Sequence, residues 1–103
     1  MALVEQLEAL LVQGQDNALI RFGLGKAYLN NRKLNQAIAH LRAAVSFDPG
    51  YSAAWKLLGQ ALTEAGQVEE AAGAYEEGIR VAEAKGDVQA AKAMRVFLNR
   101  LQR

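Results

Sequence analysis

The sequence predicts an all-α fold of about six helices joined by short turns. Two observations carry this prediction. Apolar residues recur at helical spacing in successive segments of the 103-residue chain, and these segments end at glycines or at Asp48-Pro49-Gly50. A pattern of small and apolar residues in residues 18–51 also returns in residues 52–85. With 51% apolar and 22% charged residues, the chain has the composition of a single domain that buries its own core, without disulfides or metal.

The first expected helix lies within residues 1–17. Its apolar residues recur every three or four positions: Leu3, Leu7, Leu10 and Leu11. Gly14 is a typical residue just beyond a helix C-terminus, and Asp16 is the expected N-cap of the next helix.

The second and third helices form the first expected hairpin. The second carries Leu24, Gly25 and Tyr28 on one face and meets the polar run 30–33, where the chain turns. The third carries an apolar stripe: Leu34, Ala37, Leu41, Ala44 and Val45. Pro49 cannot continue a helix, so this helix ends before it.

The fourth to sixth helices repeat the pattern. The fourth has its apolar face at i, i+3, i+4 and i+7: Trp55, Leu58, Gly59 and Leu62. After Gly66, the fifth has a longer stripe: Val68, Ala71, Tyr75, Gly78, Ile79 and Ala82. After Gly86-Asp87, the last helix has Ala90, Ala93, Met94, Phe97, Leu98 and Leu101.

The internal repeat is visible when residues 18–51 are aligned with residues 52–85. Only four of the 34 columns are identical, but they fall at packing positions: Leu24/Leu58, Gly25/Gly59, Ala37/Ala71 and Ala27/Ala61. The glycines should allow close approach between the two helices of each hairpin, and the alanines are small on the facing helix. An offset of 35 removes the glycine column.

These residues resemble the tetratricopeptide repeat (TPR) family, whose 34-residue unit is a helix A, a turn and a helix B. The unit from Ser52 matches the family pattern at several positions: Trp55, Leu58, Gly59, Ala71 and Tyr75. The unit from Ala18 matches at others: Leu24, Gly25, Tyr28, Ala37, Ala44 and Pro49. Arg21 and Glu83 depart from it. The resemblance implies an α-α superhelix of TPR helix hairpins.

The repeat grid divides residues 1–103, taken as one domain, into four segments. Residues 1–17 form an N-terminal helix, 18–51 repeat 1, 52–85 repeat 2, and 86–103 a C-terminal capping helix. Two units fall short of the three or so that such arrays need, so both flanking helices should cover the ends of the stack. Continuing the same grid places Ala93 and Val96 inward and Met94 and Phe97 on the concave side.

The resemblance also implies a function, because the family usually binds peptides in the groove lined by helix A. The implied groove positions are Leu19, Phe22, Gly23, Lys26, Leu29 and Asn30 in the first unit, and Ala53, Lys56, Leu57, Gln60, Thr63 and Glu64 in the second. Lys26, Asn30, Lys56 and Gln60 could hydrogen-bond a peptide, and Phe22 could supply an apolar face. The alternative is that the lysines are ordinary solvated surface side chains without a binding role.

Chaperone-binding members of the family hold a terminal carboxylate with a Lys and Asn clamp. Phe22 stands where the clamp has its first Lys, while Lys26 and Leu57 stand at its Asn positions. We therefore predict that this protein does not bind chaperone tails.

The last helix supports a second hypothesis. Met94 and Phe97 could form an exposed apolar patch that binds a partner or makes a weak homodimer. Alternatively, the helix tilts and buries Met94, Phe97 and Leu98 in the core. The first hypothesis is a structural or oligomerisation unit, whereas the groove hypothesis is an adaptor or assembly factor with a protein or peptide partner.

Charge is balanced overall at +1 but alternates by segment, with −3, +4, −3 and +3 in the four segments. Alternating signs should help neighbouring segments to stack, or they could steer a partner. A net charge near zero argues against nucleic-acid binding. No apolar run is long enough for a membrane span and the first residues lack a basic export signal, so a cytoplasmic location is expected.

Catalysis is not expected. His40 is the only histidine, cysteine is absent, and the serines and threonine are few, so neither a nucleophilic triad nor a metal site can be assembled from sequence. The segment 23–26 only faintly resembles a phosphate loop, because Ile20 and Ala27 replace its first glycine and its Ser or Thr. No cofactor is expected.

Overall fold

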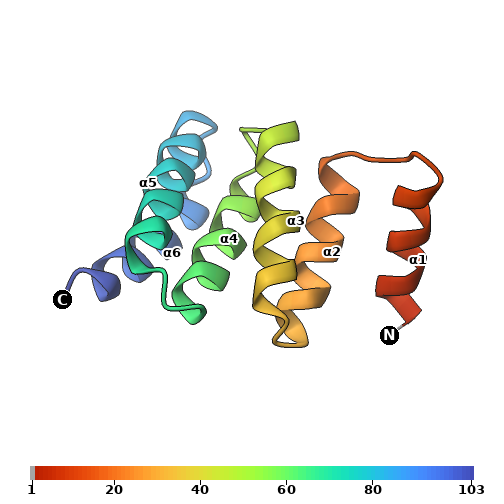
Figure 1. The fold of residues 1–103 in the computed structure, drawn as a ribbon. Helices are drawn as coiled ribbons and strands as arrows, with labels where there is room; N and C mark the ends of the chain where they lie inside the picture. Colours follow the sequence, from red (N-terminus) through yellow and green to blue (C-terminus); the bar gives the residue numbers. More distant parts are fainter. Residues whose placement is uncertain (1) are drawn as a thin grey trace.

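The computed structural model describes residues 2–103 and contains six helices, as predicted (Figure 1). Met1, at the start of the expected N-terminal segment, lies outside the described residues. The helices are α1 (Ala2–Val12), α2 (Ala18–Asn30), α3 (Leu34–Phe47), α4 (Ser52–Glu64), α5 (Val68–Ala84) and α6 (Val88–Leu101). The described residues contain no strand, which confirms the all-α class.

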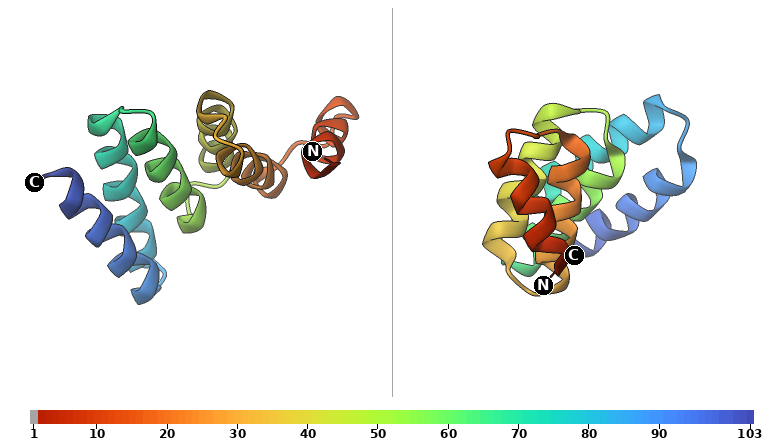
Figure 2. Two further views of the ribbon diagram at one scale, coloured as in Figure 1. Left: turned by 90° about the horizontal axis from the view of Figure 1, so that it is seen from below. Right: turned by 90° about the vertical axis from the view of Figure 1, so that its right-hand side faces the viewer.

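Two antiparallel hairpins form the centre of the molecule: α2 with α3, and α4 with α5 (Figure 1). They pack side by side through α3 and α4, while α1 lies on α2 at one end and α6 lies against α5 and α4 at the other. The views in Figure 2 show the elongated shape that results, with extents of 41 × 28 × 18 Å. This arrangement confirms a TPR helical-hairpin array.

Close approach within each hairpin depends on the repeated glycine, as expected. A Cβ atom at Gly25 would lie 2.4 Å from Cγ of Leu41, and one at Gly59 would lie 2.5 Å from the ring of Tyr75. Any side chain there would force the two helices apart, because real Cβ atoms do not come so close to their neighbours. The repeat therefore places its large residue on helix B and leaves a notch for it on helix A.

The two hairpin turns use different residues at the same place in the repeat. Gly66 closes the second hairpin with φ +79°, a conformation that glycine adopts without strain. Arg32 stands at the aligned position of the first unit and adopts φ +62°, which costs a side-chain-bearing residue about 1 kcal/mol. The Arg32 side chain in turn forms an ion pair with Glu64 of the second hairpin, so this turn also links the two units.

The N-terminus of α2 differs from the prediction. The N-cap is Asn17, whose side chain accepts a hydrogen bond of 2.9 Å from the backbone N–H of Ile20. Asp16, predicted to be the cap, instead accepts two hydrogen bonds of 2.8 Å from the guanidinium of Arg21. An arginine further along the chain competed for the carboxylate, and the neighbouring asparagine offered the same capping chemistry.

The last helix begins after Gly86-Asp87, as expected, but the repeat register continued into it is wrong by two positions. Helix α4 begins where the repeat of α2 predicts, but α6 begins at Val88 instead of at position 86, because α5 has 17 residues and α3 only 14. Met94 therefore stands at the position of Leu58 and is fully buried, while Val96 is 47% exposed rather than inward-facing. Continuing a fixed period missed this shift because the longer α5 moves the register of everything after it.

Candidate partner-binding site

The predicted groove residues lie on α2 and α4, which contact each other directly. Lys26 and Asn30 are exposed on α2, Gln60 is exposed on α4, and Lys56 is half-buried one helical turn before Gln60. The two inner helices thus present polar side chains at equivalent positions, since Lys26 of the first unit aligns with Gln60 of the second.

Three other groove positions are less open than the resemblance implies. Phe22 is half-buried and its ring stacks on Tyr51, with the centroids 4.9 Å apart. Gly23 is covered by Leu7 of α1, which would lie 3.1 Å from a Cβ atom there, and Leu29 is buried in the core. The first unit therefore offers less free apolar surface than expected.

The residues of the two sequence hypotheses meet in a pocket of about 440 Å³ between α4 and α6. Helix α4 contributes the rim that the groove pattern predicted, and α6 contributes Phe97. The lining residues are Gln60, Thr63 and Glu64 from α4, Tyr75 from α5, and Phe97, Arg100 and Leu101 from α6. Gln60 and Phe97 came from separate hypotheses, and the structure brings them to one site.

The floor of this pocket is aromatic. The rings of Tyr75 and Phe97 lie with their centroids 5.7 Å apart, in a tilted arrangement. Tyr75 is almost fully buried, and this burial raises the pKa of its hydroxyl. The neutral phenol and the half-buried Phe97 make a surface suited to an apolar side chain.

The rim of the pocket is polar, and its charges are unequally engaged. Glu64 is held by the Arg32 guanidinium and also accepts a hydrogen bond of 3.1 Å from Nε2 of Gln60. The Arg100 guanidinium lies 5.8 Å from the centroid of the Phe97 ring and makes no ion pair within residues 2–103. Glu64 is therefore already engaged by Arg32 and Gln60, while Arg100 is free to bind a ligand.

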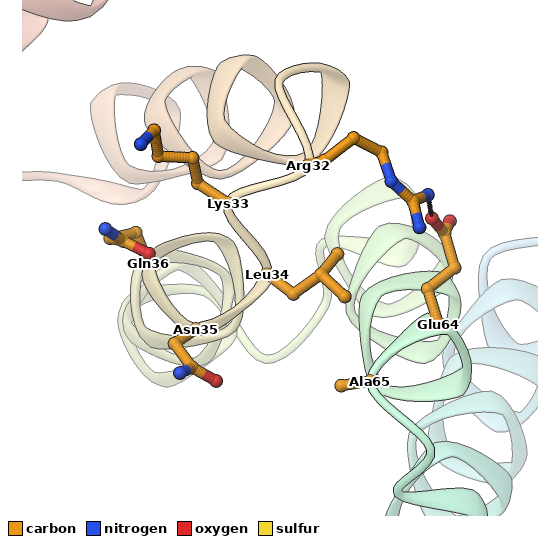
Figure 3. Close-up of a pocket in the computed structure, with 7 residues that line it drawn as sticks. All are labelled: Arg32, Lys33, Leu34, Asn35, Gln36, Glu64 and Ala65. Carbon is orange, nitrogen blue, oxygen red and sulfur yellow. Dashed lines mark hydrogen bonds and ion pairs between the residues drawn. The ribbon is translucent and has the colours of Figure 1, made fainter.

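A second hollow of about 560 Å³ lies at the seam between the two hairpins (Figure 3). Figure 3 shows Leu34 directed toward Ala65, the residue that follows α4, whereas Lys33 and Gln36 point away from the Arg32–Glu64 ion pair. Because its polar groups do not converge and its one close charged pair is already satisfied, this hollow lacks the features of a binding site.

Met94 does not belong to a partner surface, and this corrects the hypothesis of an exposed patch at Met94 and Phe97. Its sulfur occupies a notch over Gly78, where a Cβ atom would lie 2.4 Å from Sδ of Met94 and 2.9 Å from Cβ of Trp55. The alternative that the last helix buries Met94 in the core is the one observed, and it follows from the two-position shift of register in α6. Phe97 and Leu98 remain half-buried.

His40 takes part in a polar network that joins the first helix to the first hairpin. Nδ1 of His40 lies 3.1 Å from Nη1 of Arg21, and Nε2 lies 3.3 Å from a carboxylate oxygen of Glu8, which also accepts from the Tyr28 hydroxyl. Desolvation lowers the pKa of His40, which favours the neutral ring. Sequence spacing does not indicate this network, because its members come from three different helices.

Neither a metal centre nor a membrane span is found among the residues that the structure describes. No group of three or more His, Cys, Asp or Glu side chains gathers in residues 2–103. Within the same range, no helix is long and apolar enough to cross a membrane.

Three pocket residues are not assigned to a site by the sequence pattern: Tyr75, Arg100 and Leu101. The pattern identifies Tyr75 only as a core residue of the repeat. Arg100 and Leu101 follow Phe97 at i+3 and i+4, so the helical period could have identified them once Phe97 was suspected.

Comparison with known proteins gives consistent results. The tetratricopeptide repeat family model matches residues 4–52 and 22–88. A TPR repeat-containing protein of Pseudomonas aeruginosa, PA0015, is 50% identical over 101 residues, which are 98% of this chain and 96% of that protein. The solution structure of BPP2914 from Bordetella parapertussis superposes with a TM-score of 0.85, at 48% identity, over 99% of this chain and 89% of that one.

A more distant relative is the chloroplast tetratricopeptide repeat domain-containing protein PYG7 of Arabidopsis thaliana. It is 38% identical over 63 residues, which are 61% of this chain and 21% of that protein. Proteins built from these repeats generally mediate protein–protein interactions. The helix hairpins, the notch glycines and these matches together show that the chain belongs to the tetratricopeptide repeat family.

Proposed function

We propose that this protein is a non-enzymatic adaptor or assembly factor that binds a segment of a partner protein in the groove of α2 and α4. The pocket between α4 and α6 is the anchor of the groove, because Phe97 and Tyr75 provide its apolar floor while Gln60 and Arg100 stand at its polar rim. An apolar pocket with a few polar groups at its edge is the usual form of such a site. Phe22, Lys26, Asn30 and Lys56 extend the contact along the groove.

The arrangement of the polar groups supports a binding role over a catalytic one. His40 is the chain's only histidine, and both of its ring nitrogens are engaged, by Arg21 and by Glu8. It lies 14% exposed at the junction of α1 with the first hairpin and does not line the pocket. We expect the protein to act in the cytoplasm and without a cofactor.

Site-specific photo-crosslinking in cells of the source organism tests this proposal. A photoreactive phenylalanine analogue replaces Gln60 at the pocket, and in a matched variant it replaces Glu76, which is exposed on α5 and does not line the pocket. We expect a partner protein to be crosslinked from position 60 and not from position 76. Nuclease treatment should leave this result unchanged, because the proposed partner is a protein.

Two outcomes contradict the proposal. Equal crosslinking from both positions would show that the pocket is not the contact surface. Crosslinking from position 60 to a second copy of the chain alone would favour the alternative of an oligomerisation unit that uses Phe97 and α6.

A further inference from the structure

The acidic residues of the helices are concentrated on α5, whereas α3, the outer helix of the first hairpin, contains none. The three helices that border the groove and its pocket, α2, α4 and α6, contain a single acidic residue, Glu64. The outer helix α5 contains five: Glu69, Glu70, Glu76, Glu77 and Glu83. Since Glu64 is held by Arg32 and Gln60, the inner surface offers no unengaged carboxylate in residues 2–103.

The cations of the inner surface are, in contrast, free to bind. Lys26, Lys56 and Arg100 make no ion pair within the described chain. Five other arginines are already paired with acids: Arg21, Arg32, Arg42, Arg80 and Arg95. The internal ion pairs therefore leave the three groove cations unpaired; Lys33, Lys85, Lys92 and Arg103 are also unpaired, but they do not line the pocket.

Arg100 is placed for carboxylate recognition beside the apolar pocket. Its guanidinium lies near the ring of Phe97, and an arginine near an aromatic ring keeps its N–H groups available for a bidentate contact. A ligand that buries an apolar side chain against Phe97 and Tyr75 thus brings its neighbouring residues within reach of a free cation.

We propose, building on the proposed function, that the partner segment is an acidic peptide in which a leucine or similar apolar residue is flanked by aspartate or glutamate. The apolar side chain enters the pocket, Arg100 binds a flanking side-chain carboxylate, and Lys56 and Lys26 attract further acidic residues along the groove. On α5, Glu70, Glu77 and Glu83 are paired with Arg42, Arg80 and Arg95, whereas Glu69 and Glu76 make no ion pair in residues 2–103. These two unpaired glutamates repel the same peptide from α5, which also directs it to the groove.

Fluorescence anisotropy with synthetic peptides tests this inference on the full chain. The acidic probe has a central Leu between Asp-Glu pairs and blocked termini, so that only side chains carry charge. Its matched probes replace the acids by Asn and Gln, replace Leu by Ser, or carry Asn and Gln with a free terminal carboxylate. We expect the acidic probe to bind about tenfold more tightly than each of the others at low salt. At high salt it should lose its advantage over the two Asn/Gln probes, but keep its advantage over the Ser probe, because that probe carries the same charges and lacks only the apolar side chain.

Two neutralising variants locate the charge. Arg100→Gln should weaken binding of the acidic probe about tenfold. Lys85→Gln removes the same charge at the turn before α6, about 20 Å away along the helix, and should change the affinity less than twofold. Both side chains are exposed and unpaired in the described chain, so neither change should disturb folding.

The outcomes separate this inference from the proposed function. If the acidic and the Asn/Gln probes bind equally and both shift the amide NMR signals of Gln60 and Phe97, the pocket binds peptides but the inference about charge is overturned. An equal effect of Arg100→Gln and Lys85→Gln also overturns it. If no probe shifts these signals, the inference fails, and the crosslinking from position 60 decides the proposed function by itself.

Discussion

The two flanking helices cover opposite ends of the same array by different means. At the C-terminal end, α6 packs against both α5 and α4 and buries Met94 completely in the notch over Gly78. At the N-terminal end, α1 packs against α2 and reaches α3 through the contact of Glu8 with His40, and its single buried residue is Val4. Leu7, Leu10 and Leu11 are half-buried on α2, and Glu8 reaches across to Tyr28 and His40.

This difference follows from the surface on which each flanking helix packs. Gly78 leaves a notch into which a long, flexible methionine fits, so α6 becomes part of the core. The surface of α2 offers no notch of that depth, and α1 lies over it with a polar network at its side. The helix that carries the pocket residues Phe97 and Arg100 is therefore the better anchored of the two, which suits a site that must hold its shape.

The largest expected effect contrasts Met94→Ala with Leu7→Ala. Removing the fully buried Met94 side chain should lower the free energy of unfolding by about 2–5 kcal/mol, because it leaves a cavity between Gly78 and Trp55. Leu7 is only half-buried, so its truncation should cost clearly less. Urea denaturation followed by circular dichroism measures both. Equal losses would mean that the two flanking helices contribute alike.

A second prediction concerns the notch itself. In Gly78→Ala the new Cβ would collide with Met94 and with the less movable Cβ of Trp55, so we expect a loss of about 1–3 kcal/mol. Gly73→Ala lies in the same helix with nothing within 4 Å, and it should instead stabilise the protein by up to about 1 kcal/mol through helix propensity. Opposite shifts of the unfolding midpoint would confirm the notch, whereas stabilisation by both substitutions would contradict it.

The contrast between the flanks also shows what the sequence can predict. The repeat period predicts both hairpins and the notch glycines Gly25 and Gly59, because close packing of two helices requires a residue without a side chain at a fixed position. It misplaced Met94, because a period says nothing about a helix that runs longer than its counterpart, as α5 does relative to α3.

The candidate site was predicted only in part for a similar reason. The sequence points to both Gln60 and Phe97, but their meeting in one pocket depends on how α6 packs against α4 and α5, which the repeat period does not specify. The His40 network was missed because it joins side chains of α1, α2 and α3 that share no local pattern.

The smallest expected effect is the pH dependence of the N-terminal flank. Burial lowers the pKa of His40, so the folded chain binds fewer protons there than the unfolded chain does. The corresponding stability is complete above the ordinary histidine pKa of about 6.5 and is lost as the pH falls below it. Protonation would also place a hydrogen on Nδ1, which faces Arg21, although attraction to Glu8 partly offsets this effect.

Thermal unfolding at pH 7.5 and pH 5.5 measures this dependence, with His40→Gln as the control. The midpoint temperature of the wild type should be lower at pH 5.5 than at pH 7.5. The variant should show a smaller decrease, because the group that takes up the proton is gone. Amide hydrogen exchange should locate the change in α1, since Glu8 ties that helix to His40, while the amides of α6 remain unaffected. An equal decrease in both proteins would show that groups other than His40 cause the pH dependence. The polar network that attaches α1 would then not be pH-sensitive.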